Sequence, residues 1–202
     1  MPSITRLEAQ KRDKQRVNIY VDDEFFCGIT LDDVVRHKLS VGLVLTESDL
    51  TNLTANADEN KYFNKALEYL LTSPKTELQI KQYLYKKQLD PNTITTIITR
   101  LKKYNYINDA DYAQNFAQTK STKLGRKNIQ AKLMQKGINR DIITESVNEI
   151  GDQTDLVRAT AEKYMRNKTP SRETFAKLYR YLIGKGFDFD TASAIMDECK
   201  SE

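Results

Sequence analysis

The stretch "KLMQKGINRDII", residues 132–143, places a Lys-Gly step between two apolar segments with helical spacing. Gly137 is typical of the residue that follows the last turn of a helix. Asn139, two residues later, is a favoured N-cap for a new helix. The stretch therefore predicts a joint between two helices. A Lys-Gly pair also fits a phosphate-binding or catalytic loop, so neighbouring sequence must distinguish the two interpretations.

The same pattern occurs three times. "LYKKQLDPNTI" starts at Leu84, "LMQKGINRDII" at Leu133 and "LIGKGFDFDTA" at Leu182, and they align without a gap at intervals of 49 residues. The shared positions are Lys87, Lys136 and Lys185, then Gln88, Gly137 and Gly186, then Leu89, Ile138 and Phe187, and last the caps Asp90, Asn139 and Asp188. A step that recurs at one spacing indicates tandem repeats. We therefore interpret it as architectural.

From residue 61 onward the apolar spacing is helical, and proline and glycine fall between the apolar segments. The predicted helices cover about 61–72, 76–87, 91–104, 109–122, 126–136, 140–149, 153–167, 171–184 and 190–199. They group into three-helix repeats at 61–107, 108–150 and 151–202. Because a trio of short helices buries little surface alone, adjacent repeats must share surface. We expect a mainly α protein, an elongated and curved array of three tandem three-helix repeats.

Residues 1–60 precede the repeats and differ in period. In "RVNIYVDDEFFCGI", residues 16–29, apolar and polar residues alternate before Asp22-Asp23, and a second β-rich run follows. This predicts a two-stranded β-hairpin, although Asp-Asp is a poorer turn than Asp-Gly. "LDDVVRHKL" and the capping-box pattern "TESD" at 46–49 predict one or two short helices.

The net charge of +4 conceals an uneven distribution. Residues 75–140 hold 14 Lys/Arg and 4 Asp/Glu, whereas residues 1–74 and 141–202 each hold 9 and 12. A basic centre between mildly acidic ends indicates an anionic partner, with ordinary solvated helix faces as the alternative. The candidate binding residues are Lys81, Lys86, Lys87, Arg100, Lys102, Lys103, Lys120, Lys123, Arg126, Lys127, Lys132, Lys136 and Lys185.

Three of these residues, Lys123, Arg126 and Lys127, share a face near a predicted helix N-terminus, whose N–H groups suit a phosphate or carboxylate. The repeated lysines 87, 136 and 185 would line one side of a regular array, or would only offset the negative end of a helix. Interleaved tyrosines would stack on bases or form core edges; they are Tyr83, Tyr85, Tyr104, Tyr106 and Tyr112.

Signals for an enzyme, a cofactor or a metal are weak. His37 is the one histidine, and Cys27 and Cys199 lie at opposite ends of the chain. The acid pairs Asp109/Asp111 and Asp188/Asp190 stand at helix starts, where carboxylates offset exposed N–H groups. No apolar run approaches the roughly 18 residues of a membrane span. We predict a cytoplasmic protein with reduced thiols, no cofactor, no metal and no catalytic residue.

Four segments together resemble the RecX family of bacterial recombination regulators. They are "KALEYLLTSPKTELQIKQYLYKKQL", "YINDADYAQNFAQ", "GRKNIQAKLMQKGI" and "YLIGKGFDFDTASAIM", in this order. The resemblance covers roughly residues 61–199, and the N-terminal region is a looser match. Two departures are Gln88, where the family has glycine, and Asp22-Asp23, which lacks a turn glycine.

The resemblance implies a non-enzymatic modulator, mainly an inhibitor, of the RecA recombinase. Such a protein binds along the filament of RecA on single-stranded DNA and restrains ATPase activity, filament growth and strand exchange, and so regulates DNA repair. The implied partners are the RecA filament and single-stranded DNA, with no membrane, and we expect a monomer. The alternatives are a direct DNA-binding protein of the helix-turn-helix type and a helical-repeat adaptor between proteins.

Overall fold

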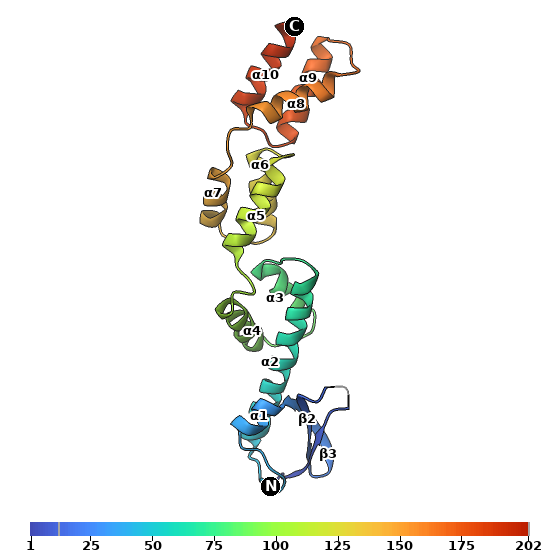
Figure 1. Ribbon diagram of the computed structural model, residues 1–202, viewed down its shortest axis with the longest axis vertical. Helices are drawn as coiled ribbons and strands as arrows, with labels where there is room; N and C mark the ends of the chain where they lie inside the picture. The colour runs from blue at the N-terminus through green and yellow to red at the C-terminus, as the bar shows by residue number, and fades with distance from the viewer. Residues whose placement is uncertain (12, 202) are drawn as a thin grey trace. The chain divides into compact units, whose positions relative to one another are not determined.

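The computed structural model describes residues 1–11 and 13–201, which form two compact units (Figure 1). The first unit comprises Met1–Ser73 and Ile80–Tyr106, and the second comprises Pro74–Gln79 and Ile107–Glu202. The described residues contain three strands and ten helices, so the prediction of a mainly helical chain is confirmed.

The N-terminal sheet has three antiparallel strands in the order β1 (Ile4–Ala9), β2 (Arg16–Val21) and β3 (Glu24–Thr30). The predicted hairpin corresponds to β2 and β3, but the expectation of only two strands is wrong because β1 pairs with β2. Asp22 and Asp23 have φ angles of 49° and 69°. Both therefore adopt the left-handed conformation that a tight hairpin turn of type I′ requires.

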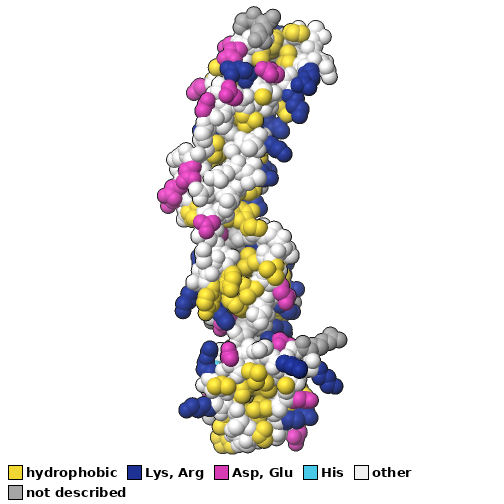
Figure 2. Space-filling view, viewed as in Figure 1, with side chains coloured by type: hydrophobic (Ala, Val, Ile, Leu, Met, Phe, Trp, Pro, Cys, Tyr) yellow, Lys and Arg dark blue, Asp and Glu magenta, His cyan; other side chains and the backbone are white. Residues whose placement is uncertain are grey.

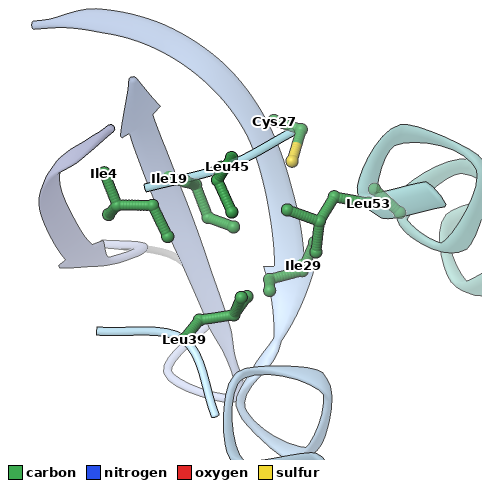
Figure 3. Close-up of a cluster of buried hydrophobic side chains, with 8 residues drawn as sticks. Ile4, Ile19, Cys27, Ile29, Leu39, Leu45 and Leu53 are labelled. Atoms are coloured by element: carbon green, nitrogen blue, oxygen red, sulfur yellow. The ribbon is translucent and has the colours of Figure 1, made fainter. Parts of the chain in front are cut away.

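The sheet buries its apolar face against the helix α2 (Glu47–Thr72). Ile19 and Ile29 are fully buried, and Figure 3 shows Leu53 pointing from the helix toward Ile29. Cys27 lies in the same cluster, where burial raises the pKa of its thiol to about 11. The hairpin is therefore stabilised by helical packing, as a short isolated sheet requires.

Two capping boxes begin the first helices. Thr30 caps α1 (Leu31–Arg36), and Thr46 caps α2, each with an aspartate at the third helical position. The "TESD" signal thus marks a true helix start. However, the helix that begins there is 26 residues long and includes the helix predicted at 61–72. It also crosses the expected boundary at residue 60.

The first repeat consists of the second half of α2 with α3 (Glu77–Tyr85) and α4 (Pro91–Lys103). Ile80 and Leu84 on α3 and Ile97 and Leu101 on α4 are fully buried. Asp90 caps α4 by accepting from the backbone N–H groups of Asn92 and Thr93, directly before the proline at the first helical position. The expected Asp-Pro start is confirmed.

The second unit holds the other two repeats (Figure 1). They consist of α5 (Asp109–Ser121), α6 (Arg126–Gln135) and α7 (Arg140–Asn148), then α8 (Thr154–Met165), α9 (Arg172–Gly184) and α10 (Phe189–Ser201). Each trio encloses its own apolar cluster, the first around Ile129 and Leu133 and the second around Leu178 and Leu182. The three tandem three-helix repeats are therefore confirmed, whereas the curvature of the array stays a prediction.

Candidate nucleic-acid interface

The Lys-Gly steps prove to be docking points between repeats. At Lys185-Gly186, the backbone N–H of Gly125 donates to the Lys185 carbonyl at 2.9 Å, and the N–H of Lys127 donates to the Gly186 carbonyl at 3.1 Å. Asn128 adds a side-chain hydrogen bond of 2.7 Å to the carbonyl of Gly184. The start of α6 in the second repeat therefore docks on the turn that follows α9 in the third.

The start of α3 meets the second repeat in the equivalent way. Thr76 Oγ1 donates to the Lys136 carbonyl at 2.8 Å, and Leu78 lies against Gly137, where an added Cβ would be 2.4 Å from Leu78 Cδ2. The backbone N–H of Glu77 donates to Asp109 Oδ1 at 2.9 Å. Asp109 therefore joins two repeats, a role beyond the helix capping expected for it.

Arg126 is committed to the joint between the second and third repeats. Its Nη2 donates to the carbonyls of Ile150 at 2.6 Å and Gly151 at 3.0 Å, and its Nη1 lies 3.6 Å from Asp188 Oδ2. The N–H groups of Gly125 and Lys127 are also used, as described above. The expectation of a phosphate-binding helix start with free N–H donors is therefore wrong at these amides.

Arg100 is likewise held inside the first unit. Its Nη1 donates to Asn60 Oδ1 at 2.7 Å and lies 3.5 Å from Glu59 Oε1, and its guanidinium lies 4.0 Å from the ring centroid of Phe63. The side chain of Asn60 in turn donates to the buried Asp33 at 2.7 Å. This network fastens α4 to α2, so Arg100 is a structural cation.

The other candidate side chains are lysines, and most are exposed. The exposed ones are Lys86, Lys87, Lys102, Lys103, Lys120, Lys123, Lys127 and Lys132, and the half-buried ones are Lys81, Lys136 and Lys185. Each repeated lysine has its Nζ near an aromatic ring: Lys87 lies 5.4 Å from Tyr83, Lys136 lies 5.4 Å from Tyr112, and Lys185 lies 5.3 Å from Tyr181. These contacts place the ammonium groups beside rings at the repeat surface.

Charge is divided between helices within the second unit. Residues 120–136, which include α6, hold six Lys/Arg and no acid, whereas residues 139–149, which include α7, hold one Arg and three acids. The third repeat has the same division. Residues 172–185 hold four basic residues and one acid, whereas α10 holds one basic residue and three acids. Figure 2 shows Lys and Arg side chains along one edge of this unit and acids on the opposite edge. The basic edge is the candidate interface.

The tyrosines separate into packed and exposed groups. Tyr83 stacks on Tyr69 with centroids 4.5 Å apart, and Tyr112 stacks on Phe116 at 6.2 Å. By contrast, Tyr85, Tyr104 and Tyr106 are 54%, 58% and 53% exposed, all in the first unit. Sequence spacing alone treated the five tyrosines alike. Solvent exposure therefore separates these three rings from the packed ones.

Residues 1–11 and 13–201 contain no group of three or more His, Cys, Asp or Glu side chains that could hold a metal ion. His37 is exposed, and its Nε2 lies 3.5 Å from Asn56 Nδ2. Neither Cys27 nor Cys199 forms a disulfide. Over the same residues, no helix is long and apolar enough to cross a membrane.

Comparison with family models gives four successive matches. Residues 2–46 match the regulatory protein RecX N-terminal domain, residues 63–101 the first RecX three-helix domain, residues 108–147 the second and residues 151–196 the third. The matched segments thus cover the N-terminal region, which by sequence was only a loose match, as well as the repeats.

Individual relatives and solved structures agree. Proteins named regulatory protein RecX from Listeria monocytogenes and Bacillus licheniformis are each 33% identical, over 98% and 100% of this chain and 76% and 79% of the relatives. A crystal structure of regulatory protein RecX has a TM-score of 0.83 and 26% identity over 98% of this chain and 100% of that one. RecX from Lactobacillus salivarius has a TM-score of 0.66 and 27% identity, over 72% and 98%.

Proposed function

This chain belongs to the RecX family of regulatory proteins, and we propose that it is a non-enzymatic modulator, mainly an inhibitor, of the RecA recombinase. It binds along the filament that RecA forms on single-stranded DNA and restrains ATPase activity, filament growth and strand exchange. The partners are the filament and its single-stranded DNA, and the protein acts as a monomer in the cytoplasm.

The observation that carries this proposal is the basic edge formed by the second helices of the repeats. Residues 120–136 hold six cations without an acid, and residues 172–185 hold four against one. An edge rich in positive charge attracts a linear anionic partner such as a strand of DNA or an acidic protein groove. Successive repeats would contact successive subunits, and a protein lodged across them would oppose the subunit motions that accompany ATP turnover.

The proposed contacts are the exposed lysines of this edge, Lys123, Lys127 and Lys132 foremost. In the first unit, Lys86, Lys87, Lys102 and Lys103 would extend the contact, with the half-buried Lys81, Lys136 and Lys185 supplying charge from the repeat surface. Arg100 and Arg126 are left out because their guanidinium groups hold α4 and the repeat joint.

The helix-turn-helix alternative places the third helix of each trio in the major groove. In the second unit, however, the third helices α7 and α10 have Asp141 and Asp190 in their first turns, and α7 carries two acids and α10 three. Acids at that end would be repelled by phosphates. Neutralising about six duplex phosphates would also give a log–log salt slope near −5. Tight, sequence-selective duplex binding with such a slope would favour this alternative.

The direct test is a titration of the cognate recombinase on single-stranded DNA. ATP hydrolysis and strand exchange are measured at increasing concentrations of this protein. We expect both rates to fall to a plateau at saturation. If both stay unchanged at saturating amounts, the proposal is wrong, and an adaptor between other proteins becomes the better interpretation.

A further inference from the structure

The first unit contains an open polar cleft of about 790 Å³ between α1, α2 and α4. Helix α2 lines it with Asn56 and Asn64, and α4 lines it with Thr99 and Lys103, followed by the C-cap residue Tyr104. Ligand pockets in proteins have volumes of about 300–1,000 Å³. The cleft is therefore large enough for a small ligand or for one or two units of a polymer.

One wall of this cleft is already saturated internally. Asp33 accepts hydrogen bonds from Thr30 Oγ1 at 2.6 Å and Asn60 Nδ2 at 2.7 Å, and Asn60 Oδ1 accepts from Arg100 at 2.7 Å. Glu59 pairs with the same guanidinium at 3.5 Å. Because these groups satisfy one another, they hold the cleft open and rigid but leave little capacity to bind a ligand.

The groups outside this wall include two asparagine amides and Lys103, together with the exposed Arg36, Asp13 and Asp32. Asn64 is exposed, and the described part of the chain gives it no hydrogen bond. Asn56 has only a 3.5 Å contact to His37. Lys103 is exposed at the end of α4. Amides that both donate and accept match the edge of a nucleobase, and one free ammonium matches one phosphodiester.

An aromatic rim completes the site. Tyr104 lines the cleft and lies 6.1 Å, centroid to centroid, from Tyr106. Tyr106 packs edge-on against Phe63, with ring centroids 6.4 Å apart, and the guanidinium of Arg100 lies 4.0 Å from the centroid of Phe63. Tyr106 is thus anchored to the rigid wall, and Tyr104 presents a ring that is 58% exposed.

We propose that this cleft binds a nucleotide of a single-stranded nucleic acid, with the base stacked on Tyr104. The amides of Asn56 and Asn64 face the base edge, and Lys103 neutralises a flanking phosphodiester. The inference deepens the proposed function, on which it rests, by assigning direct contact with the strand to the first unit.

The charge of the lining selects this ligand class. The cleft is lined by four basic and four acidic side chains, so a nucleoside triphosphate, with several adjacent charges, would be poorly compensated. A duplex is excluded because its bases are stacked and paired. A single-stranded nucleotide has an unpaired base and one phosphodiester charge. It therefore fits both the balanced charge of the lining and the aromatic rim.

The test uses the full chain without recombinase. Binding of fluorescein-labelled (dT)12 is measured by anisotropy, with (rU)12 as the arm that distinguishes DNA from RNA. We expect Tyr104→Ala to weaken binding by about 5- to 100-fold, as for loss of one stacked base, and Tyr104→Phe to stay within about twofold because phenylalanine keeps the ring. Removing the ring should leave the slope of log affinity against log salt concentration unchanged. Lys103→Gln should make that slope shallower by about 0.7.

The matched control is Tyr85→Ala. Tyr85 is 54% exposed in the same unit and does not line the cleft. Like Tyr104, which follows two lysines, it is next to a lysine pair, Lys86 and Lys87. We expect its loss to change affinity less than twofold. The far-UV circular dichroism spectrum and thermal midpoint of each variant establish that it is folded.

A second measurement locates the strand. (dT)12 with one 5-iododeoxyuridine is irradiated with the protein, and the adduct is mapped by mass spectrometry to residue 104 or 106. The inference is overturned if (dT)12 does not bind measurably, if Tyr104→Ala and Tyr85→Ala behave alike, or if the adduct maps outside the cleft. These assays contain no recombinase, so their outcome is separate from that of the recombinase titration. If the strand does not bind the cleft but recombinase is still inhibited, only the cleft proposal is refuted. If the adduct maps to the cleft but recombinase is not inhibited, only the proposed function is refuted.

Discussion

The turns at Lys87-Gln88 and Lys185-Gly186 occupy equivalent positions in two repeats and both adopt a left-handed conformation, with φ of 60° at Gln88 and 85° at Gly186. Gln88 is exposed, whereas Gly186 is buried under the start of α6, where an added Cβ would be 2.4 Å from the backbone nitrogen of Asn128. The left-handed turn alone thus tolerates a side chain, at a cost of about 1–2 kcal/mol. Glycine is required where another repeat docks.

The largest effect on stability is expected for Gly186→Ala, which tests whether glycine is required at the docked turn. The methyl group collides with backbone that cannot move away, and the positive φ adds strain, so we expect a loss of about 3–5 kcal/mol in the free energy of unfolding. Urea denaturation measures it. The control is Gly184→Ala, two residues earlier, where nothing lies within 4 Å of an added Cβ. Since Gly184 is helical, alanine there should stabilise by about 0.5–1 kcal/mol; equal losses in both variants would contradict the docking explanation.

A smaller loss, about 2–3 kcal/mol, is expected for Gly137→Ala. The added methyl group meets the side chain of Leu78 rather than backbone, with the nearest atom at 2.4 Å. Shortening that side chain should therefore relieve part of the clash. In a double-mutant cycle with Leu78→Ala, we expect a favourable coupling of about 1 kcal/mol. Strict additivity of the two changes would show that the clash is absent.

Arg126→Ala should cost about 1–3 kcal/mol because it removes charge-assisted hydrogen bonds to the carbonyls of Ile150 and Gly151. Its neighbour Lys127 has an exposed side chain, so Lys127→Ala should change stability by less than about 0.5 kcal/mol. Thermal unfolding of the two variants separates a joint residue from a binding residue. If the two variants were equally stable, Arg126 would not hold the joint and would again be a candidate binding residue.

The smallest effect is expected for Gln88→Gly. Glycine removes left-handed strain of about 1–2 kcal/mol but gains about 0.5–1 kcal/mol of unfavourable unfolded-state entropy. The net result should be a stabilisation of about 0–1 kcal/mol, measured by urea denaturation. A loss greater than about 1 kcal/mol would mean that the Gln88 side chain makes a stabilising contact and that the comparison between the turns fails.

Most of the helical architecture was predictable from sequence because prolines, glycines and caps stand between short amphipathic segments. The helices from Pro91 to the C-terminal end begin and end within two residues of the predicted bounds. Strand β1 was missed because "ITRLEA" holds few β-formers and acquires its structure by pairing with β2. The continuity of α2 was missed because its middle is rich in Asn and Thr, which are weak helix formers.

The candidate site was predictable as a set of residue types but not as a set of roles. Composition identified the basic centre, yet it could not separate Lys127, which faces solvent, from Arg126, which holds the joint. That separation depends on contacts with residues more than 20 positions away. The carboxylate of Asp188, which pairs with Arg126, was visible in the sequence. It occupies the cap position that Asp90 and Asn139 occupy in the other two repeats.

The most direct test of the proposed interface is charge reversal within the recombinase ATPase assay. The variant carries Lys123→Glu, Lys127→Glu and Lys132→Glu, and the control carries Lys11→Glu, Lys14→Glu and Lys38→Glu, all at exposed lysines. Both sets change the net charge from +4 to −2, so overall charge cannot explain a difference. We expect the half-inhibitory concentration to rise about tenfold or more for the variant and to stay within about twofold for the control. Equal inhibition by the two proteins would contradict a basic second-helix edge as the surface that meets the filament.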